Sequence, residues 1–173
     1  TDTWHHWACQ YNQISKQVKV FIDGKMVDLQ EVDTQVESFG PIVLGKRLFE
    51  PAMPFSGNIH ELRIWSVPLT GSQLFSAMNI SLSGKETGLT GYWQLNECYG
   101  KLSNEKVRNM HAKVNAQWSV EPAGYAARFD GTESAVEMGL PTIAYSPEQN
   151  FSIEFWFKGG AENDGKEVCL FSN

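Results

Sequence analysis

The sequence has few cysteines, few cations and no long apolar run. Its 173 residues include only three cysteines, whose wide spacing offers no zinc-ligand pair and leaves at least one thiol unpaired within the chain. The disulfide state of Cys9, Cys98 and Cys169 stays open. Fourteen Lys and Arg face twenty Asp and Glu, a formal net charge of −6, which excludes nucleic acid because phosphate binding needs a basic face. No apolar stretch approaches the roughly 18 residues of a membrane span, so we expect no membrane insertion.

Aromatic and β-branched residues, by contrast, recur in short runs that alternate with polar residues. In "NFSIEFWFKG" the apolar positions share one face, and Ser152, Glu154, Trp156 and Lys158 share the other. This period of two is that of a β-strand. Comparable runs predict strands in the following ranges: 4–11, 18–29, 41–45, 58–65, 89–97, 125–139 and 167–173.

Turn signals separate these runs. Asp23-Gly24 predicts a tight hairpin, because a two-residue turn needs positive φ, and "FDGTES" predicts a second hairpin around Asp130–Thr132. Thr70 and Gln73 match a capping box and predict one short helix near 71–78. The stretch 98–124 has little periodicity, and we expect it to run over the surface. The predicted fold is all-β, an antiparallel sandwich or jelly roll.

Two ordered sets of motifs resemble one family. "WHHWACQY", "VKVFIDGKMV", "IVLGKR" and "FSGNIHELRIWSVPLTGSQL" resemble the second half of a laminin G-like, concanavalin A-like lectin jelly roll, a layout that pentraxins share. "GLTGYWQLNE", "AARFDGTESAVEMG" and "FSIEFWFKG" resemble the first half of such a domain. The second-half motifs therefore precede the first-half motifs.

This order has two explanations. Residues 1–83 are the C-terminal half of one laminin G-like jelly roll and residues 84–173 are the N-terminal half of the next, as in an excerpt of a tandem array. Alternatively, residues 1–173 form one permuted jelly roll, which is tolerable because sandwich termini often lie close together. The total length suits one such domain.

Metal sites find little support in the sequence. His5 and His6 are adjacent, so on a strand they point to opposite faces and cannot chelate one ion side by side. The resemblance implies possible calcium binding at the sandwich rim, yet the family's acidic position in I-D-E is His60 here. Asp130 and Glu133 could lie near a cation, but Asp130 also suits an Asx turn with Gly131. We predict no metal site and no required cofactor.

A catalytic role is tested against the glucanases that share this jelly-roll shape. They carry E-hydrophobic-D-x-E on one strand, which places two carboxylates on one face for a retaining mechanism. In "QEVDTQVE", Glu31 and Asp33 fit, but Gln35 replaces the second glutamate and Glu37 comes two residues late. A nucleophile without its acid partner cannot run the reaction, so we predict no enzyme and no catalytic residues.

Tryptophans and two sequons complete the candidates. Five tryptophans could either stack on a sugar or pack in the core: Trp7, Trp65, Trp93, Trp118 and Trp156. Packing is the commoner role in a β-sandwich. Asn79-Ile80-Ser81 and Asn150-Phe151-Ser152 match N-glycan acceptors.

The functional prediction is a non-catalytic binding or adhesion module. We expect an extracellular or cell-surface protein whose rim loops bind a glycan or an extracellular protein, beside neighbouring domains of the same chain. The binding residues are unknown at this point. A structural spacer in a long surface fibre and a carbohydrate-active enzyme remain as alternatives.

Overall fold

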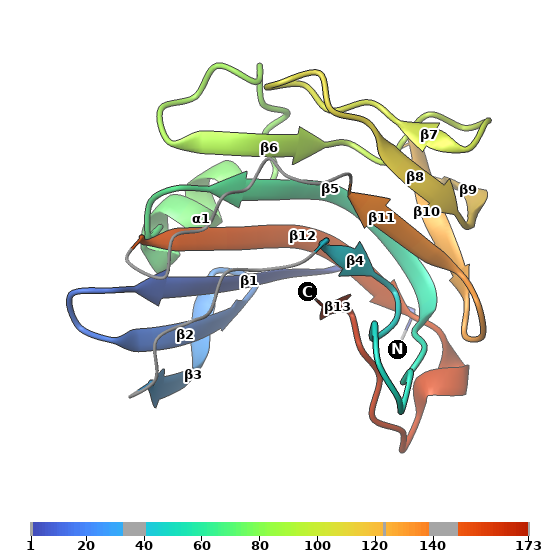
Figure 1. Ribbon diagram of the computed structural model, residues 1–173, viewed down its shortest axis with the longest axis horizontal. Helices are drawn as coiled ribbons and strands as arrows, with labels where there is room; N and C mark the ends of the chain where they lie inside the picture. The colour runs from blue at the N-terminus through green and yellow to red at the C-terminus, as the bar shows by residue number, and fades with distance from the viewer. Residues whose placement is uncertain (1, 33–40, 123, 139–148, 173) are drawn as a thin grey trace.

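Two antiparallel sheets face each other in the computed structural model, which describes residues 2–32, 41–122, 124–138 and 149–172 (Figure 1). The large sheet runs in the order β3 (Lys25–Glu31), β2 (Gln17–Ile22), β1 (His5–Asn12), β12 (Phe151–Gly159), β5 (Ser56–Trp65), β10 (Gly124–Asp130) and β9 (Gln117–Glu121), and β6 (Leu89–Trp93) also pairs with β5. The small sheet runs in the order β13 (Phe171–Ser172), β4 (Val43–Leu44), β11 (Ala135–Met138), β8 (Ala112–Asn115) and β7 (Leu102–Ser103). The predicted antiparallel sandwich is confirmed.

The main core fills the space between the sheets. Alternation on β12 sends Ile153 and Phe155 into it, and Trp7 of β1 stacks on Phe155 with 5.0 Å between ring centroids. β5 adds Ile59, Leu62 and Ile64, which are all fully buried. The faces predicted for 151–158 are therefore those observed.

Strands from both predicted halves share both sheets. β12 lies between β1 and β5, and β4 lies between β11 and β13. Residues 1–83 and 84–173 thus bury one common core in this chain. Whether that chain is an excerpt of a tandem array or one permuted jelly roll stays a prediction.

A second, smaller core lies on the outer face of the large sheet, under the helix. Helix α1 (Gly71–Ala77) begins at the predicted capping box, in which the backbone N–H of Gln73 donates to Thr70 Oγ1 and the backbone N–H of Thr70 donates to Gln73 Oε1 at 2.9 Å. Leu74 is its buried residue. It packs in a cluster with the following side chains: Ala8, Phe21, Trp65, Leu69, Leu89 and Tyr92.

Two local predictions differ from the structure. The Asp23-Gly24 hairpin is confirmed, with Ile22 paired to Lys25, but no hairpin forms around Asp130–Thr132. β10 belongs to the large sheet and β11 to the small one, so the turn carries the chain across the sandwich. The physical reason is that β10 already has β5 and β9 as neighbours.

The stretch 98–124 was also predicted incorrectly as surface chain. It contributes β7, β8 and β9. β8 has only four residues, with Ala112 and Val114 buried and their neighbours exposed. So short an alternation is a weak signal in sequence, and pairing with β11 stabilises it.

Candidate functional site

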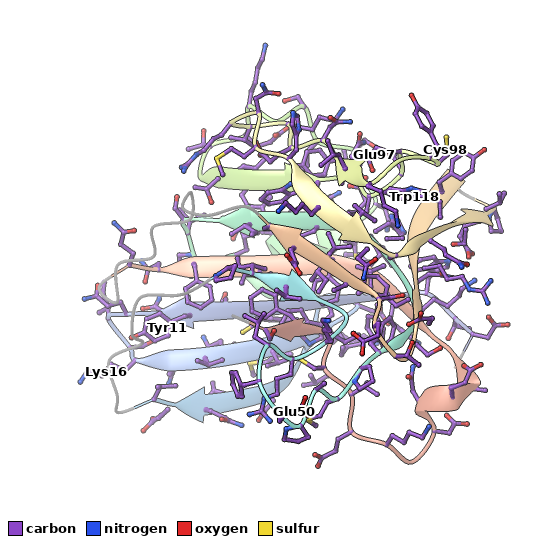
Figure 2. The ribbon with its side chains drawn as sticks, turned by 45° about the vertical axis from the view of Figure 1, so that its right-hand side comes forward. Tyr11, Lys16, Glu50, Glu97, Cys98 and Trp118 are labelled. Atoms are coloured by element: carbon purple, nitrogen blue, oxygen red, sulfur yellow. The ribbon has the colours of Figure 1, made fainter. Side chains whose placement is uncertain are left out.

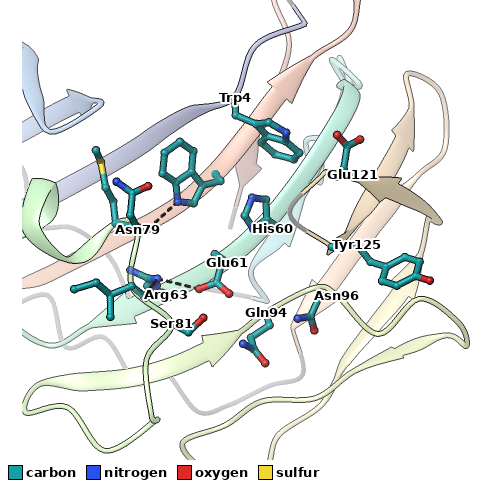
Figure 3. Close-up of a pocket in the computed structure, with 14 residues that line it drawn as sticks. Trp4, His60, Glu61, Arg63, Asn79, Ser81, Gln94, Asn96, Glu121 and Tyr125 are labelled. Carbon is teal, nitrogen blue, oxygen red and sulfur yellow. Dashed lines mark hydrogen bonds and ion pairs between the residues drawn. The ribbon is translucent and has the colours of Figure 1, made fainter.

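A groove of about 380 Å³ opens on the outer face of the large sheet, beside the area covered by α1 (Figure 3). We call it the outer groove. Its volume lies within the usual range for small-molecule sites. Its lining combines aromatic rings with amides and carboxylates, contributed by Trp4, His60, Glu61, Arg63, Asn79, Ser81, Gln94, Asn96, Glu121, Tyr125 and Trp156.

Three rings form one end of the outer groove. Trp156 follows Phe155 on β12 and so points away from the main core. His60 stacks beside Trp156 with 6.3 Å between centroids and 9° between planes, and Trp4 meets His60 edge-on at 4.6 Å. Burial lowers the pKa of His60 below its usual value, so its ring is neutral at pH 7.

A buried ion pair forms the floor. Arg63 Nη2 lies 2.9 Å from Glu61 Oε2, and the Tyr92 hydroxyl donates to the same carboxylate at 2.8 Å. Burial, together with the charge of Glu61, raises the pKa of Tyr92 to about 12. Tyr92 therefore remains a hydrogen-bond donor at any physiological pH.

Side chains of the large sheet hold the segment that follows α1, which forms one wall of the outer groove. Arg63 donates from Nη1 to the carbonyl of Ala77 at 3.0 Å and from Nη2 to that of Ile80 at 2.6 Å. Trp156 Nε1 donates to the carbonyl of Met78 at 2.9 Å. The sheet thus fixes the segment 78–81 along one side of the outer groove.

Glu154 connects this floor to the helix-covered core. Its Oε1 accepts from Trp65 Nε1 at 2.9 Å and lies 3.7 Å from Arg63 Nη1, while its Oε2 lies 2.8 Å from His6 Nε2. His6, Arg63 and Glu154 are almost fully buried. A buried guanidinium such as that of Arg63 persists only when it is paired.

Glu121 lines the outer groove on the side of Trp4 (Figure 3). Its carboxylate accepts from Asn58 Nδ2 at 2.8 Å and from Lys158 Nζ at 2.7 Å. Lys158 Nζ also lies 5.4 Å from the ring centroid of Trp4. Beyond Glu121 a second, more polar cleft of about 610 Å³ begins, which Glu121 and Lys158 both line.

The paired histidines have separate structural partners. His5 Nδ1 lies 2.9 Å from Asp23 Oδ2, whereas His6 faces Glu154 on the other side of the sheet. Partial burial would raise the pKa of Asp23, but hydrogen bonds from the His5 ring and the His6 backbone outweigh it and lower the pKa. The His5 and His6 rings therefore point to opposite faces of β1, as predicted.

Asp130 makes the turn that the sequence suggested as its alternative role. Its Oδ1 accepts from the backbone N–H groups of Thr132 at 2.9 Å and Ser134 at 3.2 Å, and Glu133 instead lies 3.5 Å from Lys46. Within the described ranges, no three His, Cys, Asp or Glu side chains gather as a metal-ion site. That the chain needs no calcium or other cofactor stays a prediction.

Of the glucanase-like carboxylates, Glu31 lies among the residues that the structure describes. Glu31 ends β3, an edge strand exposed along its whole length. Asp33, Gln35 and Glu37 lie outside the described residues. Glu31 does not line the outer groove.

The tryptophan candidates divide between core and groove. Trp65 and Trp93 are buried, and Trp7 and Trp118 pack against the main core. Of these five tryptophans, only Trp156 lines the outer groove. Trp4 and Tyr125, which the sequence did not single out, line it too. Alternation placed Trp156 on the outer face, but no local signal showed which distant rings would join it.

The remaining candidates are structural or exposed. All three cysteines are free thiols, and Cys98 lies exposed on the loop after β6 (Figure 2). Asn150 accepts from the backbone N–H of Gln13 at 2.9 Å, whereas Asn79 of the other sequon lines the outer groove.

Sheet topology defines an antiparallel β-sandwich that carries a groove on the outer face of its large sheet. The laminin G family model described as the concanavalin A-like lectin/glucanases superfamily matches residues 1–75. The laminin G-like resemblance is therefore confirmed over that part of the chain. No curated protein and no solved structure matches the chain. In the part of the chain that the structure describes, no helix is long and apolar enough to cross a membrane.

Proposed function

We propose that this chain is a non-catalytic binding module of a secreted or cell-surface protein, and that it binds a glycan in the outer groove. The observation that carries the proposal is the lining of that groove. Partly exposed Trp4, Tyr125 and Trp156 line it together with side-chain amides and carboxylates. The laminin G-like family over residues 1–75 supports the same class of function.

The chemistry of this lining suits a sugar. A pyranose offers apolar C–H faces that pack on aromatic rings, and hydroxyl groups that need both donors and acceptors. Carboxylates accept hydroxyl donors strongly, and Glu61 and Glu121 are oriented by partners before any ligand arrives. Such preorganisation reduces the entropic cost of binding.

The proposal moves the binding surface from the rim loops to the sheet face. Rim loops remain adjacent, because the segment 78–81 forms a wall of the outer groove. A catalytic role has no comparable support, since both groove carboxylates are engaged by Arg63, Tyr92, Asn58 or Lys158. A structural spacer would not need an aromatic groove of this kind.

The test is calorimetric binding of the whole chain to a panel of neutral and acidic hexasaccharides. We expect at least one to bind, and Trp4→Ala or Tyr125→Ala to weaken that binding about tenfold or more, equivalent to about 1.4 kcal/mol. Tyr99→Ala is the matched control, because Tyr99 is 79% exposed and lies outside the groove lining. No binding to any member, or equal losses in the control, would contradict the proposal.

A further inference from the structure

The cations around the outer groove already have acceptor partners. Arg63 has a side chain only 2% exposed, and its guanidinium contacts Glu61 and two backbone carbonyls. Lys158 Nζ lies 2.7 Å from Glu121 Oε2 and 3.9 Å from Asp2 Oδ1. Neither cation offers an anionic ligand a free partner.

The third possible cation is His60, and it is uncharged. Its ring lies between Trp4 and Trp156, and burial lowers its pKa. The groups that face it include Glu61, Arg63, Glu121 and His6. At pH 7 His60 contributes a polar, neutral surface.

The lining itself holds two carboxylates, Glu61 and Glu121, against one guanidinium, that of Arg63. Arg63 is also shared with Glu154, which lies 3.7 Å from its Nη1, so negative charge is in excess at this face. Glu61 and Glu121 are only 13% and 10% exposed, so solvent screens them weakly. A carboxylate or sulfate entering here would lose its hydration and meet like charge, which acts as a repulsive element against such ligands. Hydroxyl groups would instead donate to the same oxygens.

We propose that the outer groove selects uncharged sugars and that Glu121 rejects anionic glycans such as uronic acid, sialic acid or sulfated chains. This inference rests on the glycan-binding function proposed above and names the class of its ligand. Glu121 is the determining residue because it lines both the outer groove and the adjoining polar cleft. Glu61, at the floor, is held by Arg63 and Tyr92.

The experiment compares matched ligands. A neutral hexasaccharide that binds is oxidised at C6 to its uronate form, and the affinities of both are measured by calorimetry at pH 7. For the unmodified chain we expect the uronate form to bind at least about tenfold more weakly. The difference in affinity between the neutral and the uronate form should narrow as salt rises from about 0.01 M to 0.5 M, because salt screens the repulsion between the uronate and the groove carboxylates.

The variant Glu121→Gln isolates the residue. It keeps a carbonyl oxygen for Asn58 but leaves Lys158 without its closest carboxylate. The uronate form should gain affinity and the gap should fall to about threefold or less, while the neutral form loses about fivefold at most, the value of one hydrogen bond. Glu137→Gln is the control, since it makes the same charge change at an exposed position of β11 in the other sheet.

The outcomes separate the two proposals. Equal or tighter binding of the uronate form by the unmodified chain overturns the selectivity, while the glycan-binding function stands. An unchanged gap in Glu121→Gln, with an unchanged unfolding midpoint, overturns the role of Glu121. Absence of binding to every neutral and acidic probe overturns both.

Discussion

Asp130 illustrates how one carboxylate can stabilise a crossing between two sheets. Backbone N–H groups of Thr132, together with those of Ser134, lower the pKa of Asp130 to about 2. The ionised side chain thereby replaces backbone acceptors that the turn lacks. At this scale the chemistry is local and is visible in the "DGTES" spacing itself.

Acid should weaken this turn in a defined window. Because the folded pKa of Asp130 is below its ordinary value of 3.8, its stabilisation is present above about pH 4 and lost as pH falls towards 2. Solvent screening limits the contribution of this exposed group to about 1 kcal/mol. Asp130→Asn should keep the turn but remove that pH dependence, and Asp130→Ala should also lose about 1 kcal/mol at pH 7. Denaturant unfolding of the three proteins from pH 2 to 7 measures this; identical slopes would contradict it.

The thiols should react in order of exposure. Burial raises the pKa of Cys9 to about 11, so little thiolate forms at pH 8. Cys98 is exposed, and we expect a water-soluble disulfide reagent to label it first, with Cys9 labelled at least about 100-fold more slowly until the chain unfolds. Peptide mass analysis over time identifies the modified residue, and Cys98→Ser should remove the fast phase.

At the scale of elements, β5 joins two parts of the outer face, the outer groove and the segment after α1. One strand presents His60 to the outer groove, and Arg63 to the segment after α1. Its neighbour β12 supplies Glu154 and Trp156 to the same face. The groove wall therefore depends on side chains of the sheet rather than on helix propensity, since α1 has only seven residues.

Removing the guanidinium should loosen that wall. Arg63→Gln leaves Glu61 and Glu154 without their cation, so we expect a loss of about 3–5 kcal/mol in the free energy of unfolding. Faster amide hydrogen exchange at 78–81 should accompany it, because the carbonyl of Ala77, just before this segment, and the carbonyl of Ile80, within it, lose their donor. Arg128→Gln, at an exposed position of β10, should change stability by no more than about 0.5 kcal/mol. Equal effects of the two variants would contradict the assigned role.

For the whole molecule, the long-range pairings decide cooperativity. Neither residues 1–83 nor residues 84–173 form a complete sheet alone in this structure. β12, from the second half, lies between β1 and β5, which both belong to the first half. Each half alone exposes half of the main core. Because the two halves share one core, we expect them to unfold together in one cooperative transition.

We expect this chain to be monomeric and to unfold in one transition. Circular dichroism and tryptophan fluorescence should give coincident denaturation curves, because both halves contribute tryptophans to one core. A chain cleaved after Ser83 should keep its halves associated on gel filtration, since the cut leaves every strand intact. An aggregated or molten state would instead favour the tandem-excerpt explanation, in which each half needs another partner.

Much of the fold was predictable because it depends on local periodicity. Alternation assigned the two faces of β12, and Thr70 with Gln73 located the start of α1. The turn at Asp130 was recognised, but not the sheet change that it makes. β8 was missed because its four residues carry too little pattern to distinguish from loop.

The sequence by itself determined that this chain forms short amphipathic strands, one capped helix and a laminin G-like motif set over its first part. It also determined that His5 and His6 point apart, since that follows from strand geometry alone. Only the tertiary structure decided which outer-face side chains α1 covers and which remain open, and hence that Trp4, Tyr125 and Trp156 line one groove. The reason is that their juxtaposition depends on pairings between strands far apart in the chain, which no local pattern encodes.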